Sequence, residues 1–371
     1  MKKIFFEQAR RVVVKIGSSL LIRDNKFNEE WVESLIEDLE FLTKKEIEII
    51  LVASGSVSLG KSYLKVKSAK LRIHEKQAYA ACGQVILMNN FMKIFEKKGK
   101  KVAQILLTYS DTEDRRKSLN SRDTINEVLK CAILPIINEN DSVAVDELKF
   151  GDNDRLAARV AQISNSDFLI LLSDVDGLFT TNPKKSKSSK LVKVVEKIDK
   201  KIIKMASNET NAYGTGGMST KLQAADIAMS CGCSTIICNG NISKPIRSFL
   251  NSSRGTLFVP RKRDKNKLKN WIAGTVRPSG KIIIDNGASS AISKRASLLP
   301  SGVIKVIGNF LKGDIVSIEN EKGLKIGKGI SYYDSSEIKK IMGKKTSDLK
   351  NILGYHGRNE IIHRDCLTLN D

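Results

Sequence analysis

Apolar runs alternate with stretches of helical periodicity through the first 250 residues of the chain. Apolar residues at helical intervals predict a helix after the potential capping residue Asn28 and a long helix from about His74 to Lys98. Continuous apolar strands between helices are typical of a parallel sheet covered on both faces, so we expect an α/β fold. The runs that predict buried strands are Arg11–Ile16, Ile47–Ala53, Val102–Leu107, Ala132–Ile137, Phe168–Leu172 and Thr235–Cys238.

The pattern changes near Pro260. The segment PRKRDKNKLKN is polar and basic, which is typical of a linker. Beyond it, short apolar runs punctuated by Gly and Asp predict a small β-rich domain. We therefore expect domains at 1–259 and 273–371, joined by a basic linker at 260–272. The predicted strands of the second domain are Lys281–Ile284, Val303–Ile307, Ile315–Ile318 and Leu324–Ile330.

Length and composition fit a two-domain globular protein. The chain has 371 residues, of which 41% are hydrophobic and 28% charged. Its apolar runs are strand-sized and fall short of the roughly 20 residues that a membrane helix needs. The N-terminus MKKIFFEQARR begins like a signal peptide, but charge resumes at Glu7 before an adequate apolar region forms. We therefore expect a cytoplasmic protein without a membrane segment.

Cysteine spacing and net charge bear on two kinds of site, a zinc site and a surface that binds nucleic acid or other anions. Six scattered cysteines and three histidines give no spacing typical of zinc, and we expect reduced cysteines that pack as small apolar groups. The net charge is +22, with a pI near 9.6. This charge fits binding to nucleic acid or an anionic surface, but it equally fits a lysine-rich composition spread over solvated faces.

Two turns that directly follow predicted strands combine small residues with groups that suit phosphate. Lys15-Ile16-Gly17-Ser18-Ser19 places an ammonium beside a glycine, whose backbone can approach an anion closely. Ala53-Ser54-Gly55-Ser56-Val57 leaves the N-terminus of the next helix open, which favours anions. Either turn alone also fits an ordinary strand–helix connection, and their occurrence in one sheet strengthens the phosphate-site interpretation.

A dense group of carboxylates and amides follows a later strand. INEND, residues 137–141, ends an apolar run, and GDND, residues 151–154, comes shortly afterwards. Asp141 can hold an ammonium and the amide of Asn153 can bind a carboxylate, so the pair would recognise a zwitterionic small molecule. In the alternative interpretation, Asp152 is simply the N-cap of the next helix.

Two further segments have the character of a nucleotide site. Ser173 and Asp174 follow a strand, where a hydroxyl and a carboxylate can contact a ribose or base. The loop GTGGMSTK, residues 214–221, opens a helix and delivers a lysine, although it is not a Walker A motif because its lysine follows the Ser-Thr pair. Exposed amides, a helix N-terminus and a cation suit phosphates. A flexible capping loop is the alternative, but three closely spaced glycines cost backbone entropy unless close approach is needed.

These segments together resemble the amino-acid kinase superfamily. KIGSS, ASGSV, INENDSVAV, GDNDRLAA, LLSDVDGLF and GTGGMSTKLQAA occur in that family's order, and INEND and GDND are similar to those of glutamate 5-kinases. WIAGTVRPSGKIIIDNGASSAI, with GNFLKGD later, resembles the PUA domain attached to many bacterial members. The resemblance implies a three-layer α/β/α sandwich with a mainly parallel sheet, then a small, barrel-like PUA domain. It also implies that MgATP phosphorylates the γ-carboxylate of L-glutamate, the first step of proline biosynthesis.

The resemblance assigns roles to individual residues. Lys15 and Lys221 would hold the transferring phosphoryl group, and Asp154 would orient both lysines. Ser54, Asp141 and Asn153 would bind glutamate. No metal ligand is assigned, although the reaction implies ATP and Mg²⁺. The residues that would bind ATP are Lys15, Ser173, Asp174, Thr215, Gly216, Gly217, Met218, Ser219, Thr220 and Lys221.

The chain departs from the family pattern at two places. Arg155 follows GDND where a neutral polar residue is expected, and we expect its side chain to be exposed on its helix. SGSVSLG, residues 54–60, replaces a pattern of smaller residues like SGAIAAG, which bears only on helix packing.

Partners and alternatives remain open at this point. The family implies a functional partnership with glutamate-5-semialdehyde dehydrogenase (glutamyl phosphate reductase), and we expect a homo-oligomer, either a dimer or a tetramer.

Aspartate, N-acetylglutamate, carbamate and UMP are alternative substrates, although INEND, GDND and the PUA domain favour L-glutamate. RNA binding is an alternative function, since PUA domains commonly occur on RNA-modifying enzymes and the charge would suit phosphates. Against it, aromatics are only 6% and form no dense basic–aromatic patch. We prefer a PUA domain that shapes the oligomer or tunes regulation.

Overall fold

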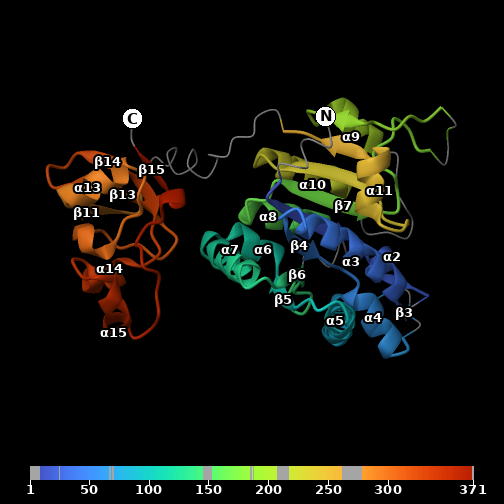
Figure 1. Ribbon diagram of the computed structural model, residues 1–371, viewed down its shortest axis with the longest axis horizontal. Helices are drawn as coiled ribbons and strands as arrows, with labels where there is room; N and C mark the ends of the chain where they lie inside the picture. The colour runs from blue at the N-terminus through green and yellow to red at the C-terminus, as the bar shows by residue number, and fades with distance from the viewer. Residues whose placement is uncertain are drawn as a thin grey trace. The chain divides into compact units, whose positions relative to one another are not determined.

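The computed structural model describes residues 9–24, 26–66, 68, 71–144, 153–183, 186, 188–206, 217–260 and 278–369. The chain divides into two compact units, Met1–Arg263 and Asp264–Asp371 (Figure 1). The predicted linker, 260–272, lies outside the described residues except for Pro260, so the predicted domain boundaries stay predictions. Each helix within the described ranges is too short or too polar to span a lipid bilayer.

An eight-stranded sheet forms the centre of the first unit, counted over the described residues. Neighbouring strands run parallel from β5 to β9, whereas β10 is antiparallel to β9. This arrangement confirms the predicted, mainly parallel sheet. The strands, in spatial order, are β5 (Val102–Leu107), β6 (Leu134–Glu139), β4 (Glu48–Val52), β1 (Arg11–Ile16), β7 (Phe168–Ser173), β9 (Ser234–Asn239), β10 (Thr256–Phe258) and β8 (Val194–Val195).

Helices cover both faces of this sheet (Figure 1). Alternate residues of β1 point to opposite sides: Val12 and Val14 join one core cluster, and Val13 joins the other. The first cluster includes residues of α3, α5 and α11, and the second includes residues of α7, α8 and α10. The predicted three-layer sandwich is therefore confirmed. The helices are α2 (Ser18–Leu21), α3 (Glu29–Thr43), α4 (Ser56–Tyr63), α5 (Ile73–Glu96), α6 (Tyr109–Glu113), α7 (Arg115–Lys130), α8 (Asp154–Ile163), α9 (Lys200–Ala206), α10 (Met218–Ser230) and α11 (Pro245–Ser252), and a short hairpin, β2 (Ile22–Arg23) and β3 (Lys26–Phe27), follows α2.

Two local predictions differ from the structure. The strand predicted at Ala132–Ile137 begins two residues later, because Ala132 adopts a positive φ of 55° in the turn after α7. Asn28 occupies the N-cap position of α3, but its side chain makes no cap hydrogen bond. Its amide donates instead to the carbonyl of Leu20 at 3.2 Å, which holds the preceding segment against the helix start.

Helices α4 and α5 pack with almost no space between their backbones. A Cβ atom at Gly60 would lie 1.8 Å from the carbonyl oxygen of Tyr79, and one at Gly83 would lie 1.8 Å from that of Ser56. Both distances are far inside van der Waals contact, so only glycine fits at these positions. The contact at Gly83 fixes Ser56, the first residue of α4, against the middle of α5. Figure 1 shows these two helices side by side.

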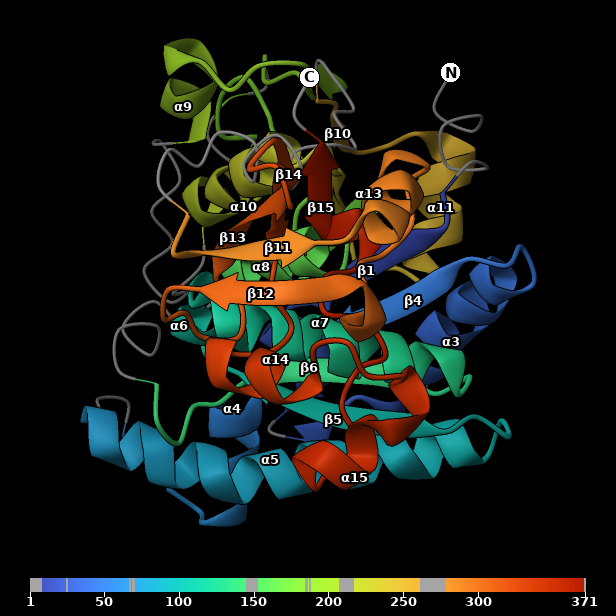
Figure 2. The same cartoon turned by 90° about the vertical axis from the view of Figure 1, so that its left-hand side faces the viewer.

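The second unit is a small β-rich structure, as predicted, with a five-stranded sheet in its described part (Figure 2). Strand β11 lies parallel to β13, and the other neighbours are antiparallel. The short edge strand β15 had no counterpart in the sequence-based expectation. The elements are, in sheet order, β12 (Val303–Ile307), β11 (Gly280–Ile284), β13 (Ile315–Asn320), β14 (Lys325–Ile330) and β15 (Leu367–Leu369), with helices α13 (Asn286–Ser293), α14 (Ser335–Ile341) and α15 (Leu349–Leu353) and short 3₁₀ turns at Pro300–Gly302, Thr346–Asp348 and Arg364–Cys366.

Candidate active site

Polar residues gather where the parallel strands of the first unit end. Lys15 lies near the end of β1, Ser54 follows β4, Glu139 ends β6 and Ser173 ends β7. Because these strands run parallel, their carboxyl ends lie at one edge of the sheet. Open α/β sheets bind their ligands at this edge.

Two lysines contact a single buried carboxylate at this edge. Asp154 Oδ1 lies 2.7 Å from the ammonium of Lys15, and Asp154 Oδ2 lies 3.0 Å from that of Lys221. The side chain of Asp154 is fully buried, and those of Lys15 and Lys221 are 5% and 10% exposed. Two ammonium groups and one carboxylate leave a net positive charge in a poorly solvated position, which favours an anionic ligand.

Three elements bring this group together. Lys15 comes from β1, Asp154 is the first residue of α8, and Lys221 lies in the first turn of α10. The hydroxyl of Thr220 lies 3.3 Å from Asp154 Oδ2 and donates to the carbonyl of Gly217 at 2.8 Å. Residues far apart in the sequence are thus held by one carboxylate, as the assigned orienting role of Asp154 requires.

The turn after β1 leaves open space for a ligand. A Cβ atom at Gly17 would meet nothing closer than the carbonyl oxygen of Leu172 at 3.8 Å, and Gly17 has an ordinary φ of −69°. Neither crowding nor strain within the described residues therefore requires glycine here. The open space beside its backbone fits the close approach of a phosphate group.

The predicted nucleotide residues lie partly within the described chain. Ser173 donates to Asp174 Oδ1 at 3.1 Å, at the end of β7. Gly217 is the N-cap of α10, and Met218 is buried while Ser219 is exposed at the helix start. Thr215 and Gly216 lie outside the described residues.

The other predicted site residues surround the turn between β4 and α4. Ser54 donates its hydroxyl hydrogen to the carbonyl of Ile16 at 3.0 Å, which ties this turn to β1. Ser56 donates to Asp141 Oδ2 at 2.6 Å. Burial raises the pKa of Asp141, and the hydrogen bond from Ser56 offsets only part of that effect. No basic side chain of the described residues forms an ion pair with Asp141, so its carboxylate suits a cationic ligand.

Asn153 uses both hydrogens of its amide within the protein. Its Nδ2 donates to the carbonyl of Ala53 at 2.5 Å and to Asn138 Oδ1 at 2.7 Å. We expected this amide to bind a carboxylate, which would need a free hydrogen. The side-chain atom left for a ligand is instead the oxygen Oδ1, which accepts hydrogen bonds.

Asn138 and Gln84 were missed as site residues. Asn138, inside INEND, is 2% exposed and bonds both Asn153 and Gln84. Its position in the motif was the available signal. Gln84, in the middle of α5, has no local sequence signal, because its contact with Asn138 spans 54 residues.

The predicted exposure of Arg155 is wrong. Its side chain is partly buried, and its guanidinium lies 4.4 Å from the ring centroid of Tyr109 on α6. Arg159, one turn later, also lies over this ring and donates to the hydroxyl of Tyr109. These cation–π and hydrogen-bond contacts hold the first turns of α8 against α6.

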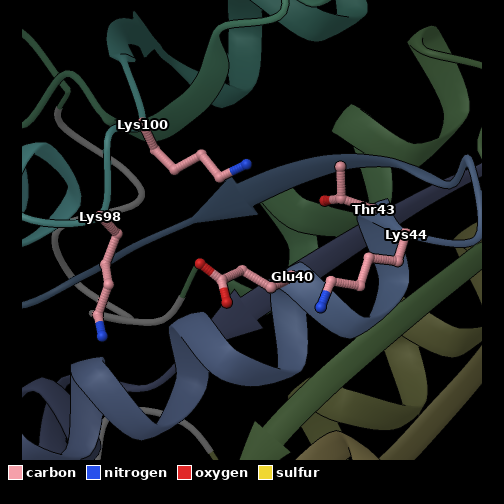
Figure 3. Close-up of a pocket in the computed structure, with 5 residues that line it drawn as sticks. All are labelled: Glu40, Thr43, Lys44, Lys98 and Lys100. Atoms are coloured by element: carbon pink, nitrogen blue, oxygen red, sulfur yellow. The ribbon is translucent and has the colours of Figure 1, made fainter.

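A hollow near the amino ends of the strands, opposite the site, plays no part in it (Figure 3). It is lined by Glu40, Thr43, Lys44, Lys98 and Lys100, around the C-terminal ends of α3 and α5. Lysines at helix C-termini are favoured by the helix dipole, which accounts for this cluster without a ligand.

Comparisons with known proteins follow the same division of the chain. The amino acid kinase family matches residues 10–239, and the PUA domain matches residues 280–353. A glutamate 5-kinase from Pelagibacter ubique is 43% identical over 366 residues, which cover 98% of this chain and 100% of that protein. A glutamate 5-kinase from Bradyrhizobium diazoefficiens is 42% identical over 364 residues, with 98% of each chain covered.

Among solved structures, a carbamate kinase from Giardia lamblia bound to AMP-PNP is 16% identical, with a TM-score of 0.49, and covers 68% of this chain and 99% of its own. The assignment comes from the sequence relatives, which match along nearly the whole length. The chain belongs to the amino acid kinase family and, within it, to the glutamate 5-kinases with a C-terminal PUA domain.

Proposed function

We propose that the protein transfers the γ-phosphoryl group of ATP to the γ-carboxylate of L-glutamate, which yields L-glutamate 5-phosphate and ADP. This reaction is the first step of proline biosynthesis. The observation that carries the proposal is the 43% identity to a curated glutamate 5-kinase over 98% of this chain.

The reaction needs positioning and charge neutralisation rather than a general base. A carboxylate nucleophile is already ionised at neutral pH. Both reactants are anionic, so their approach is repulsive unless cations lie between them. Lys15 and Lys221 supply these cations next to the transferring phosphoryl group, and Asp154 holds the two ammonium groups in place.

Glutamate is recognised by the groups around the β4–α4 turn. The carboxylate of Asp141 and the oxygen Oδ1 of Asn153 accept hydrogen bonds, so both suit the α-ammonium of glutamate. Ser54 donates to the carbonyl of Ile16 at the end of β1, and its oxygen can still accept a hydrogen bond. On the other side of β1, Ser173, Asp174 and the start of α10 bind ATP.

The magnesium ion is expected to arrive with the nucleotide. The described residues contain no group of three or more His, Cys, Asp or Glu side chains that would hold a metal ion. Mg²⁺ in kinases is commonly bound through substrate phosphates and one or two carboxylates. When bound, it would supply charge neutralisation on the phosphates, in addition to that from Lys15 and Lys221.

The remaining partners stay predictions. The acyl phosphate product carries its own α-amine and can cyclise, which favours a partnership with the reductase that consumes it. A homo-oligomer, a cytoplasmic location and RNA binding by the PUA domain also remain expectations from the sequence and the family.

The substrate is tested by trapping the acyl phosphate. Purified protein with MgATP and hydroxylamine should form an acyl hydroxamate from glutamate, but not from aspartate or N-acetylglutamate. Hydroxamate formed mainly from another acid would retain the kinase fold and reject the glutamate assignment. Absence of turnover with all three acids would reject the proposed reaction and favour the RNA-binding alternative.

Replacing Asp141 by asparagine should raise the glutamate KM by about 30-fold or more, the scale for losing one partner of a buried charge pair. The ATP KM should stay within about twofold, because Asp141 lies on the glutamate side. Burial raises the pKa of Asp141, and a bound ammonium favours the ionised form. In the wild-type protein, kcat/KM for glutamate should therefore fall as the pH drops through this raised pKa. That inflection should be absent from the pH profile of the Asp141→Asn variant.

The unliganded Asp141→Asn variant should melt at or above the wild-type temperature near neutral pH. In the wild type, the partly buried carboxylate of Asp141 has no counter-charge among the described residues, which lowers the free energy of unfolding. The variant does not carry this charge. An unchanged glutamate KM, or the same pH inflection in both proteins, would reject Asp141 as the ammonium ligand.

A further inference from the structure

Three side-chain amides form a hydrogen-bonded chain between helix α5 and the start of helix α8. Asn153 Nδ2 donates to Asn138 Oδ1 at 2.7 Å, and Asn138 Nδ2 donates to Gln84 Oε1 at 2.6 Å. Asn153 directly precedes Asp154, which binds both active-site lysines. The chain therefore connects a residue in the middle of α5 to the centre of the proposed site.

Backbone groups fix the direction of this chain. The carbonyl of Ala53 can only accept, so Asn153 must present Nδ2 to it. The N–H of Glu139 can only donate, and it donates to Asn138 Oδ1 at 2.9 Å. Asn138 is left with Nδ2 for its third neighbour, and Gln84 must offer its oxygen.

This arrangement leaves one amide group without a partner. Gln84 Nε2 is buried and makes no hydrogen bond to any described residue. A buried, unpaired amide is unfavourable, and such groups in folded proteins need an explanation. Turning the Gln84 amide over would bring two donors face to face, so the contact with Asn138 determines its orientation. An apolar side chain at this position would avoid the unpaired Nε2, but it would remove the acceptor of Asn138 Nδ2.

The backbone next to Gln84 is also fixed. Gly83 lies against the carbonyl of Ser56 so closely that a single Cβ atom would come within 1.8 Å of it. Ser56 in turn donates to Asp141. In α5, Gly83 thus contacts Ser56, which donates to Asp141. The next residue, Gln84, accepts from Asn138, which in turn accepts from Asn153.

We propose that Gln84 is a positioning residue for glutamate. Its Oε1 holds Asn138, and Asn138 holds Asn153 so that Oδ1 of Asn153 faces the α-ammonium of the substrate. Without this acceptor, the amide of Asn138 loses its partner and turns towards another one, which removes a fixed contact of Asn153. The inference rests on the proposed function, since it concerns the glutamate side of that site.

The replacement Gln84→Met keeps the length of the side chain and removes the acceptor. It should raise the glutamate KM by about tenfold, equivalent to about 1.4 kcal/mol. kcat and the ATP KM should stay within about twofold, because the lysines and the nucleotide side do not touch Gln84. The matched control is Asn90→Leu on the same helix. The partly buried Asn90 amide donates to the carbonyl of Ile86 in its own helix and bonds no other described residue. This control should leave both KM values unchanged.

A second variant tests the inference if Gln84→Met does not fold. Gln84→Glu keeps both the shape and the acceptor, and burial favours its protonated form, which has the donor and acceptor layout of glutamine. The ionised form would also accept from Asn138, so the glutamate KM should stay within about twofold of that of the wild type at every pH. A glutamate KM raised about tenfold in Gln84→Glu would show that the acceptor atom is not what position 84 supplies, and would overturn the inference.

These outcomes separate the inference from the function on which it rests. Failure of the wild-type protein to form hydroxamate from glutamate would reject the proposed function itself. An active wild type with an unchanged glutamate KM in Gln84→Met would overturn only the role of Gln84. Equal increases in the KM for glutamate and ATP, or the same increase in Asn90→Leu, would also overturn it, because a general structural defect would account for them.

Discussion

Replacing Lys221 or Lys15 by alanine should lower kcat by at least about 100-fold, the scale for losing one preorganised electrostatic group. Each ammonium lies within 3.0 Å of Asp154 in a nearly closed environment. Its charge is therefore poorly screened and acts strongly on a transferring phosphoryl group. The effect should appear in kcat more than in the KM for glutamate, because charge on the phosphoryl oxygens redistributes during transfer.

The control for both lysine variants is Lys100→Ala. Lys100 is exposed and lies in the hollow near the amino ends of the strands (Figure 3). This variant removes the same charge from the protein and should keep the wild-type kcat. A loss of tenfold or less in both Lys15→Ala and Lys221→Ala would reject the roles assigned to these lysines.

Replacing Asp154 by asparagine should destabilise the first unit by about 3–5 kcal/mol, the range for removing one partner of a buried ion pair. Asp154 is fully buried, and its neutral replacement would remove a carboxylate charge that contacts both ammonium groups. The measurement is the midpoint of thermal unfolding, with activity assayed separately below that temperature.

A second substitution distinguishes charge from packing. Adding Lys15→Met to Asp154→Asn removes one of the two ammonium groups that have lost this carboxylate, so the double variant should unfold at a higher temperature than Asp154→Asn alone. It should remain inactive, because Lys15 is lost. A single Asp154→Asn variant with wild-type stability would contradict the arrangement of two lysines on one carboxylate.

The main strands of the first sheet could be predicted because they are buried on both faces. β1 and β5 have the predicted bounds, and β4, β7 and β9 differ by no more than one residue at either end. In β6 the prediction stopped before Asn138 and Glu139, since polar residues normally end an apolar run. Here they continue the ladder opposite Leu106 and Leu107, because their polar groups are bonded within the site. Short strands such as β10 and the edge strand β8 have too few residues for a periodic signal.

The site residues could be predicted only where they lie in a recognisable sequence motif. Lys15, Asp154 and Lys221 lie in separate motifs, and the structure brings their side chains together. The direction of hydrogen bonding at Asn153 could not be read from the sequence, because it depends on the carbonyl of Ala53, 100 residues away. The positions of Gln84 and of Arg155 depend likewise on tertiary contacts with Asn138 and Tyr109.

The strand order has a consequence for how such an enzyme can change its substrate. β4 and β6, with the proposed acceptor-binding groups, lie on one side of β1, and β7 and β9, next to the proposed nucleotide-binding segments, lie on the other. In the sequence, the acceptor side falls between Ala53 and Asn153, and the nucleotide side begins at Ser173. Lys15 and Asp154 lie where the two sides meet. Evolution or design could therefore replace the acceptor half as a block, with a new phosphate acceptor as the outcome, while the nucleotide half and the two lysines are inherited unchanged.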